Sequence, residues 1–457
     1  MRIATTLILP LVLSACALAP PAKVEAPAPA QWQTPPAHNG SLTDLNQWWR
    51  QQGDPVLVRL IDAAQAASPT IATAGSRIAQ SRAQRAAAGA ALLPSLDAAV
   101  SVSRANQQST LPGGTTSQAA LQAGWEIDLF GGRRAERDAA QARLAGATAG
   151  WHEARVAVAA EVANLYYSLR SCEQLYLVAQ QDAQSRADTA RLTQLTADAG
   201  FQSPSTAALA RASAADGSSR ATLQRALCDI DLKNLVSMTA LDEPALRAML
   251  AGAPEVPAPA IAVSEVPAKL LAQRPDVFAA EREVAAASAD VGSAQADRFP
   301  RLSLSGSVGA ANFRSGGQNT QTDTWTIGPL ALSLPIFDGG RRSANVDAAK
   351  ARYEAAVIAY RASARRAVSE VEQALVNLNS STARSSDAQI SLEGYRAAFV
   401  AAEDRYKNGL GSLLELEDAR RTRLAAENAV VTLQRERNAA WVALYRAAGG
   451  GWTSSAQ

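Results

Sequence analysis

Few residues of this chain have the types and spacing that enzyme chemistry requires. The 457 residues include two histidines, His38 and His152, and neither has Cys, Asp or Glu neighbours at metal-ligand spacing. The sequence contains no nucleophile elbow and no phosphate-binding glycine loop. A formal net charge of +2 gives no electrostatic reason to expect nucleic-acid binding. We therefore expect a protein that is not an enzyme, with no metal, no cofactor and no nucleic-acid partner.

The first of the three cysteines follows what reads as an export signal. Met1 and Arg2 make a short positive start, an apolar run extends from Ile3 to Leu13, and residues 13–16 read Leu-Ser-Ala-Cys. This ending resembles the bacterial lipobox, in which the cysteine becomes the lipidated first residue of the mature protein. The resemblance implies a covalent lipid such as palmitate on Cys16 and sorting to the outer membrane. The alternative is an ordinary signal peptide with a chance cysteine.

The rest of the chain repeats itself. The Gly-Gly-Arg-Arg sequence at Gly131–Arg134 recurs at Gly339–Arg342, a shift of 208, and Gly200 has its counterpart at Gly409, a shift of 209. Landmarks in the same order with nearly constant spacing indicate an internal duplication.

Composition supplies the boundaries between segments, because two stretches are rich in proline and poor in large apolar residues. The predicted division is a signal peptide over 1–15, a lipid-anchored extended tether over 16–40, a first repeat over 41–253, a proline-rich linker over 254–267, a second repeat over 268–452 and a tail over 453–457.

Each repeat has the pattern of a helix followed by two strands. Apolar residues alternate with polar or small ones in the strand-like segments, as expected of strands with two different faces. The predicted helices are Pro69–Ala91 and Pro275–Arg298, and the predicted strands cover 96–102, 121–129, 302–308 and 325–337.

A long helical hairpin follows each strand pair. The intervals from Gly132 to Gly200 and from Gly340 to Gly409 span 68 and 69 residues and contain no proline. At 1.5 Å per residue, a helix of that length spans roughly 100 Å. Gly200 and Gly409 stand where a C-terminal cap would end such a helix, and a returning helix is expected after each.

Four strands per chain are too few for a closed barrel in a membrane. An open sheet edge cannot face lipid, and the smallest membrane barrels have about eight strands. Closure therefore requires several chains, and three copies would supply twelve strands. We expect a mixed α and β membrane protein in which a trimeric 12-stranded β-barrel is continued by a long antiparallel α-helical tunnel.

The order of short motifs along the chain resembles the TolC-type outer-membrane efflux channels, in particular their lipoprotein branch, the NodT/OprM-like outer-membrane factors. The matching segments are Trp48–Arg50 with Asp54-Pro55, Trp125–Gly131, Arg274–Asp276, Leu334–Gly340, and Ala440–Arg446 with Gly449–Trp452. The resemblance implies a homotrimer in the outer membrane that extends into the periplasm. It also implies two partners, a periplasmic adaptor and an inner-membrane RND-type pump that together export drugs or other toxic small molecules.

The resemblance also assigns roles at the hairpin turns. Residues 405–412 resemble the second turn of the family, where the tube narrows and adaptors dock. Glu415 and Asp418 align with a pair of acids that ring the periplasmic aperture, and three copies of each would favour cations. The alternative is a solvated helix face, because Glu417 lies between them and acids are common early in helices. The expected docking residues are Gly200, Phe201, Ser203, Tyr406, Gly409, Leu410 and Ser412.

Cys172 and Cys228 are placed symmetrically about the first turn. Cys172 lies 28 residues before Gly200 and Cys228 lies 28 residues after it. On antiparallel helices that turn near Gly200 they would lie at similar height, and an exported protein meets an oxidising compartment. A disulfide is one interpretation, and two buried free thiols are the other.

Two other functions remain open at the level of sequence. A channel for type I protein or peptide secretion belongs to the same family. A periplasmic adaptor lipoprotein also carries a lipid anchor and a helical hairpin, although a single one.

Overall fold

The computed structural model describes residues 24–25, 28–29, 32–34, 48–51, 53–106, 113–251, 271 and 273–452. The predicted signal peptide, Cys16, most of the tether with His38, the linker 254–267 and the tail 453–457 lie outside the described residues. In the described part of the chain, no α-helix combines the length and the apolar character that a bilayer span requires.

The described residues belong to two compact units. The first unit takes them from Met1–Pro27, Ala74–Gly150 and Phe278–Ser363, and the second from Ala28–Thr73, Trp151–Val277 and Ala364–Gln457. Each unit therefore contains segments of both predicted repeats.

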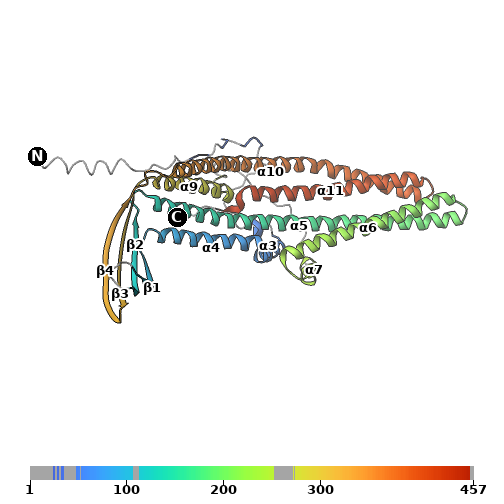
Figure 1. The fold of residues 1–457 in the computed structure, drawn as a ribbon. Coiled ribbons are helices and arrows are strands. Elements are labelled where there is room, and N and C mark those ends of the chain that lie inside the picture. Colours follow the sequence, from blue (N-terminus) through green and yellow to red (C-terminus); the bar gives the residue numbers. More distant parts are fainter. Residues whose placement is uncertain are drawn as a thin grey trace. The chain divides into compact units, whose positions relative to one another are not determined.

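The first unit contains one antiparallel sheet of four strands in the order β1-β2-β3-β4 (Figure 1). The strands are β1 (Ser95–Ala105), β2 (Gly114–Ile127), β3 (Arg301–Ser315) and β4 (Gln318–Ser333). The central pair joins the two repeats, since β2 pairs with β3 from Gly114 opposite Ser315 to Ile127 opposite Leu302. Among the described residues, the outer strands β1 and β4 each pair with one neighbour only.

The second strand hairpin is longer than the sequence predicts. The predicted strands left residues 309–324 as a loop, whereas β3 and β4 are separated only by Gly316 and Gly317. Both glycines have positive φ, 56° and 85°. A two-residue turn of this kind matches the twist of the flanking strands, so the Ser-, Gly- and Asn-rich segment extends the pairing.

Two helices of 67 residues each follow the strand pairs, as the proline-free intervals predict. They are α5 (Gly132–Asp198) and α10 (Arg341–Lys407), and the returning helices are α6 (Pro204–Thr239) and α11 (Leu413–Ala447). Gly200 and Gly409 have φ of 78° and 71°, the left-handed conformation that ends helices. The N–H of the residue after each glycine returns to the helix, Phe201 to the carbonyl of Thr196 and Leu410 to that of Arg405, both at 2.8 Å.

An aspartate caps the start of each long helix. Asp128 accepts hydrogen bonds from the N–H groups of Arg133 and Arg134 at 3.1 and 3.0 Å. Asp338 accepts from the N–H groups of Gly340 and Arg342 at 3.1 and 3.2 Å. Desolvation opposes ionisation of both carboxyls, but these hydrogen bonds and the paired arginine prevail and hold each pKa below its usual value. The negative charge of each aspartate also interacts favourably with the helix dipole, whose positive end is the N-terminus.

Shorter helices complete the two units, and α4 and α9 lie where the sequence predicts them. They are α2 (Trp48–Gln51), α3 (Pro55–Ala67), α4 (Pro69–Ala90), α7 (Glu243–Ala251), α9 (Pro275–Ala296) and the 3₁₀ turn η3 (Gly449–Gly451).

An aromatic core in the second unit brings α2, near the start of the chain, into contact with the last turns of α11. The ring of Trp48 stacks on that of Tyr445, with 5.0 Å between centroids and 17° between planes. Asp54 caps α3 by accepting a hydrogen bond from the N–H of Val56 at 2.9 Å, and the Tyr166 hydroxyl donates to it at 2.6 Å. The motifs near residues 48 and 445 are therefore core residues of one unit.

Candidate functional site

The turn of the first helical hairpin, residues 199–210, is uncharged and partly apolar. Ser203 caps α6 by accepting a hydrogen bond from the N–H of Thr206 at 3.1 Å. The side chain of Phe201 is 82% exposed at the turn. No Asp, Glu, Lys or Arg occurs between residues 199 and 210. The turn itself offers apolar surface and hydroxyl groups, and the nearest exposed charges are Asp198 at the end of α5 and Arg211 on α6.

The tip of the second hairpin is held by a capping box. The N–H of Glu415 donates to Ser412 Oγ at 3.2 Å, and the N–H of Ser412 donates to Glu415 Oε2 at 3.4 Å. This reciprocal pair fixes the start of α11. Leu410 and Leu414 remain 71% and 75% exposed beside it. Both tips therefore combine a glycine turn, a capping serine and exposed apolar side chains.

Tyr406 does not share this exposure. Its side chain is buried, and its hydroxyl lies 2.6 Å from Thr193 Oγ1 on α5. The Thr193 hydroxyl donates to the carbonyl of Thr189 at 2.7 Å, so Tyr406 is the donor to Thr193. The last turn of α10 directs this ring toward α5, and Tyr406 therefore links the two hairpins instead of offering a docking surface.

Glu415 and Asp418 share one exposed face of α11, as their spacing predicts. Their side chains are 57% and 62% exposed. Glu417 lies between them in sequence but turns to the other side, where its side chain is 19% exposed. One chain thus presents two carboxylates to solvent and directs the third into the interior.

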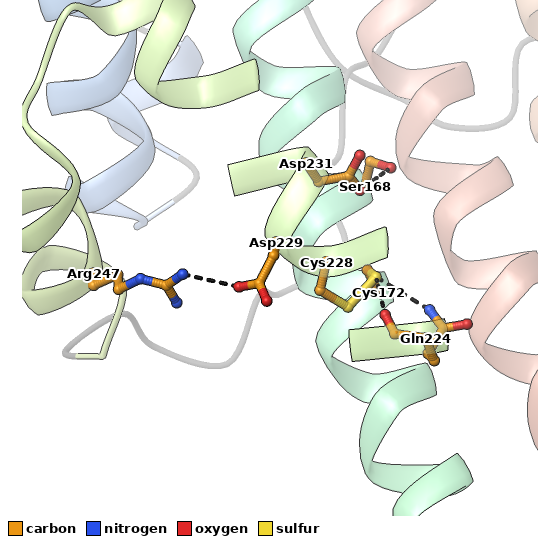
Figure 2. The surroundings of a disulfide bond; sticks show 7 residues. All are labelled: Ser168, Cys172, Gln224, Cys228, Asp229, Asp231 and Arg247. Carbon is orange, nitrogen blue, oxygen red and sulfur yellow. Dashed lines mark hydrogen bonds and ion pairs between the residues drawn. A yellow bond between two sulfur atoms is a disulfide. The ribbon is translucent and has the colours of Figure 1, made fainter. Parts of the chain in front are cut away.

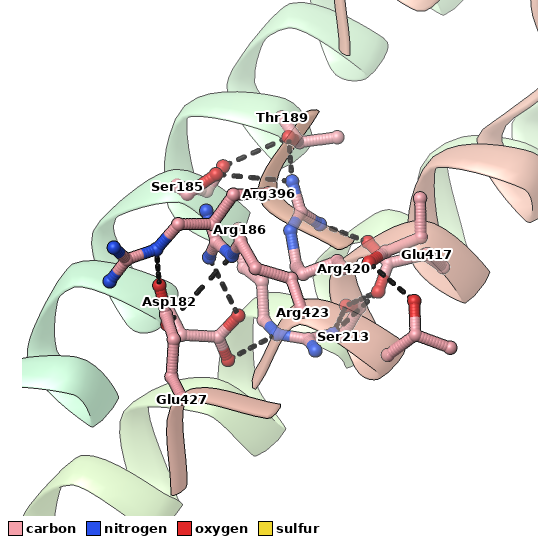
Figure 3. A network of polar contacts seen from close by, with 12 residues as sticks. Asp182, Ser185, Arg186, Thr189, Ser213, Arg396, Glu417, Arg420, Arg423 and Glu427 are labelled. Carbon is pink, nitrogen blue, oxygen red and sulfur yellow. Dashed lines mark hydrogen bonds and ion pairs between the residues drawn. The ribbon is translucent and has the colours of Figure 1, made fainter. Parts of the chain in front are cut away.

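Glu417 is the centre of a buried polar network that joins three helices (Figure 3). Arg186 Nη1 on α5 lies 2.5 Å from Glu417 Oε2, and Ser213 Oγ on α6 donates to the same oxygen at 3.0 Å. Arg420 on α11 donates to the other oxygen of Glu417 and, at 2.8 Å, to Thr189 Oγ1. The network therefore ties the first hairpin to the second.

Further charges extend the network along α5, α10 and α11. Arg186 Nε also pairs with Asp182 at 2.8 Å, and Arg423 stacks over the Phe399 ring at 3.9 Å. Arg396 of α10 pairs with Glu427 of α11 at 3.1 Å. Opposite charges alternate through the group, which limits the cost of burying each of them.

Arg420 is a central residue of this network that sequence reasoning did not single out. Its side chain is 0% exposed. Burial disfavours the charged form and lowers the pKa of Arg420, while the carboxylate of Glu417 acts in the opposite direction. Arg211 occupies the equivalent place in the first repeat and is exposed. The duplication pattern aligns the two arginines but cannot tell which one is buried.

Cys172 of α5 and Cys228 of α6 form a disulfide, with their Cα atoms 5.5 Å apart (Figure 2). Gln224 Nε2 donates to Cys172 Sγ at 3.1 Å. One turn of each helix away, the Ser168 hydroxyl donates to Asp231 at 3.1 Å. The bridge therefore clamps the two helices of the first hairpin at one height.

No group of His, Cys, Asp and Glu that could hold a metal occurs among the residues that the structure describes. His152 packs its ring against Trp151 on the same helix, with 4.9 Å between centroids. Burial and the nearby charge of Arg155 lower the pKa of His152. This histidine is part of an aromatic cluster in the second unit.

Two helical hairpins joined to a four-stranded sheet make up the fold of an outer-membrane channel. The solved structure of the outer-membrane channel OprN superposes with a TM-score of 0.85 at 28% identity, covering 95% of this chain and 99% of that one. The CmeC outer membrane channel of Campylobacter jejuni shares the fold with a TM-score of 0.85 at 24% identity, covering 97% of this chain and 96% of that one.

Sequence comparison places the chain in one family. The model of the outer membrane efflux protein family matches residues 60–240 and 266–450, one segment in each half of the chain. The chain therefore belongs to the outer membrane efflux protein family, which confirms the resemblance seen in the motifs.

Similar proteins include the pyoverdine export outer membrane protein OpmQ of Pseudomonas aeruginosa, 31% identical over 98% of this chain and 96% of that protein. The solvent efflux pump outer membrane protein SrpC of Pseudomonas putida is 29% identical over 97% of each chain. Matches that run through both repeats favour the channel over the adaptor alternative.

Proposed function

We propose that three copies of this chain form the outer-membrane channel of a tripartite efflux system that exports small organic molecules. The observation that carries this proposal is a four-stranded sheet with two unpaired edges, each of whose strand pairs is followed in the sequence by a helical hairpin. Within the described residues β1 and β4 each lack a second neighbour. The unpaired N–H and C=O groups of an exposed edge strand can pair with a strand of another chain. In a membrane these groups cannot face lipid, so the sheet must close.

Three copies close the sheet as a barrel of twelve strands. The strands carry large apolar side chains that the single chain leaves exposed, among them Val100, Trp325 and Ile327 at 80%, 72% and 88%. Soluble proteins rarely expose so many apolar side chains on one element, whereas lipid accepts them. The outer membrane supplies that environment, and a lipid on Cys16 adds an anchor to it.

The hairpin tips are the docking surface for a periplasmic adaptor, which in turn contacts an inner-membrane RND-type pump. Phe201 of the first tip and Leu410 and Leu414 of the second are exposed apolar side chains beside polar capping residues. Apolar anchors surrounded by polar groups are typical of protein interfaces. Glu415 and Asp418, exposed on the same tip, line the aperture when three copies meet.

The names of the relatives indicate the class of cargo. They are described as proteins of pyoverdine export and of solvent, toluene and antibiotic efflux. All of these are small organic molecules, which favours efflux over secretion of polypeptides for this chain.

The subunit count is the first test. The lipidated protein is extracted in detergent, and its mass is measured by light scattering with the detergent mass subtracted. Three subunits per particle, together with conductance in planar bilayers, are the expected result. A stable monomer without conductance would contradict the shared barrel.

A further inference from the structure

The exposed charges of the second tip balance one another. The exposed charged residues between positions 404 and 421 are three acids and three bases, namely Asp404, Glu415, Asp418, Arg405, Lys407 and Arg421. Over the matching range of the first tip, 195–212, the exposed charged residues are one acid and one base, Asp198 and Arg211. The exposed side chains that one copy brings to the tips therefore carry a net charge close to zero, although its carboxylates taken alone suggest an acidic ring.

Each of the two aperture carboxylates lies beside an arginine. Arg421 Nη2 lies 2.5 Å from Asp418 Oδ1, and Arg405 Nη2 lies 3.8 Å from Glu415 Oε2. The four side chains are between 57% and 77% exposed. Pairs with this exposure contribute little to folding stability. Arg405 Nη2 also donates to the Leu410 carbonyl across the turn at 3.3 Å, so for this arginine the fold has a use besides the ion pair.

We infer that Arg405 and Arg421 set the charge selectivity of the aperture, so that it admits small organic anions as well as cations. This inference rests on the proposed function, because it needs the tips to line a pore. A ring of unpaired carboxylates would hold anions out by Coulomb repulsion. An arginine within 4 Å of each carboxylate leaves only a dipole, whose field falls off over a few ångströms in water.

The test is the reversal potential of the full lipidated protein in planar bilayers under a tenfold KCl gradient. The wild-type pore is expected to be nearly unselective between K⁺ and Cl⁻. In the double variant Arg405→Gln with Arg421→Gln, the carboxylates lose their partners. In water, an unpaired negative charge about 6 Å away raises the local concentration of a passing cation by roughly threefold. The preference for K⁺ over Cl⁻ should therefore rise at least roughly threefold.

Matched variants separate selectivity from general effects of substitution. Arg421→Lys keeps the charge and should keep the wild-type reversal potential. Glu415→Gln with Asp418→Asn should move it toward Cl⁻, and glutamine can still cap α11. Arg191→Gln is the control away from the aperture turn, because Arg191 is also exposed, at 76%, and pairs with Asp188 at 3.5 Å on α5. It should leave the reversal potential unchanged.

The outcomes distinguish this inference from the function on which it rests. A wild-type pore with strong K⁺ selectivity, or a double arginine variant with the wild-type reversal potential, overturns the inference and leaves the channel in place. A wild-type protein that inserts into bilayers without any conductance overturns the proposed function, and the inference with it.

Discussion

Arg186 of α5 and Glu417 of α11, 231 positions apart in the sequence, meet at 2.5 Å and join the two hairpins of one chain. The same carboxylate accepts hydrogen bonds from Ser213 of α6 and from Arg420 of α11. The side chains of the two arginines are buried, with Arg186 7% and Arg420 0% exposed. Glu417 thus bonds directly to both arginines at the same time.

Replacing Glu417 should therefore destabilise the protein far more than its partial exposure suggests. In Glu417→Gln, Arg420 loses the carboxylate to which it is bonded. Arg186 keeps only its ion pair with Asp182. Breaking a buried pair from one side costs about 3–5 kcal/mol. We expect a large fall in the thermal unfolding temperature of the detergent-solubilised protein, followed by circular dichroism.

The neighbouring acid provides the control for this substitution. Asp418→Asn removes a carboxylate one position away that is 62% exposed. A surface change of that kind is expected to alter stability by at most about 0.5 kcal/mol. Equal effects of the two substitutions would show that the network does not hold the hairpins together.

Removing the Tyr406 hydroxyl should weaken the second link between the hairpins. In Tyr406→Phe the ring stays buried, but Thr193 Oγ1 loses the donor that lies 2.6 Å away. The loss of one buried hydrogen bond costs about 1 kcal/mol. Tyr395→Phe is the matched control, because Tyr395 is on the same helix and is 44% exposed. Equal midpoints of thermal unfolding for the two variants would argue against the link.

The bridge between Cys172 and Cys228 should leave no reactive thiol at either position. The mature protein, denatured without reductant, is titrated with a thiol reagent, and a Cys172→Ser/Cys228→Ser variant is the blank. The two cysteines are 56 positions apart, and closing a loop of that length stabilises a fold by about 4 kcal/mol in the chain-entropy model. The serine variant should therefore also unfold at a lower temperature. Two reactive thiols per chain would contradict the bridge.

Long-range periodicity predicted the large elements correctly. The two proline-free intervals of nearly equal length in the duplicated halves indicated the long helices, and Gly200 and Gly409 marked their ends because glycine adopts the left-handed conformation that ends a helix. The turn at Gly316-Gly317 was harder to place. Strand length there depends on which residues face a partner strand, and polar residues on an exposed sheet obscure the alternation that marks a strand.

The pairing of charges could not be predicted from the sequence. Glu415, Glu417 and Asp418 are three acids within four positions of one helix, yet Glu417 turns inward to pair with buried arginines and the other two face solvent. The helix period assigns Glu417 to a different face, but only the packing of α5 and α6 shows that this face carries Arg186 and Ser213. The burial of the Tyr406 side chain could not be predicted for the same reason, because the turn residues around it are exposed.

The cap at the start of α5 should make stability depend on pH in the acid range. The pKa of Asp128 lies below the ordinary value of 3.8, despite desolvation that acts the other way, because of its bonds to Arg134 and to the N–H groups of the first turn. A carboxyl with a lowered pKa in the fold contributes stability above about pH 4 and loses that contribution as the pH falls through the folded value. Asp128→Asn should therefore cost about 1 kcal/mol near neutral pH.

The difference in unfolding temperature between wild type and Asp128→Asn should shrink when the measurement is repeated near pH 3. Asp138→Asn is the control on the same helix, because Asp138 is 59% exposed and pairs with its neighbour Arg137 at 2.7 Å. The unfolding temperature of that variant should equal that of the wild type at both pH values. A constant gap between wild type and Asp128→Asn from neutral pH to pH 3 would mean that the ionised carboxylate is not what holds the start of α5.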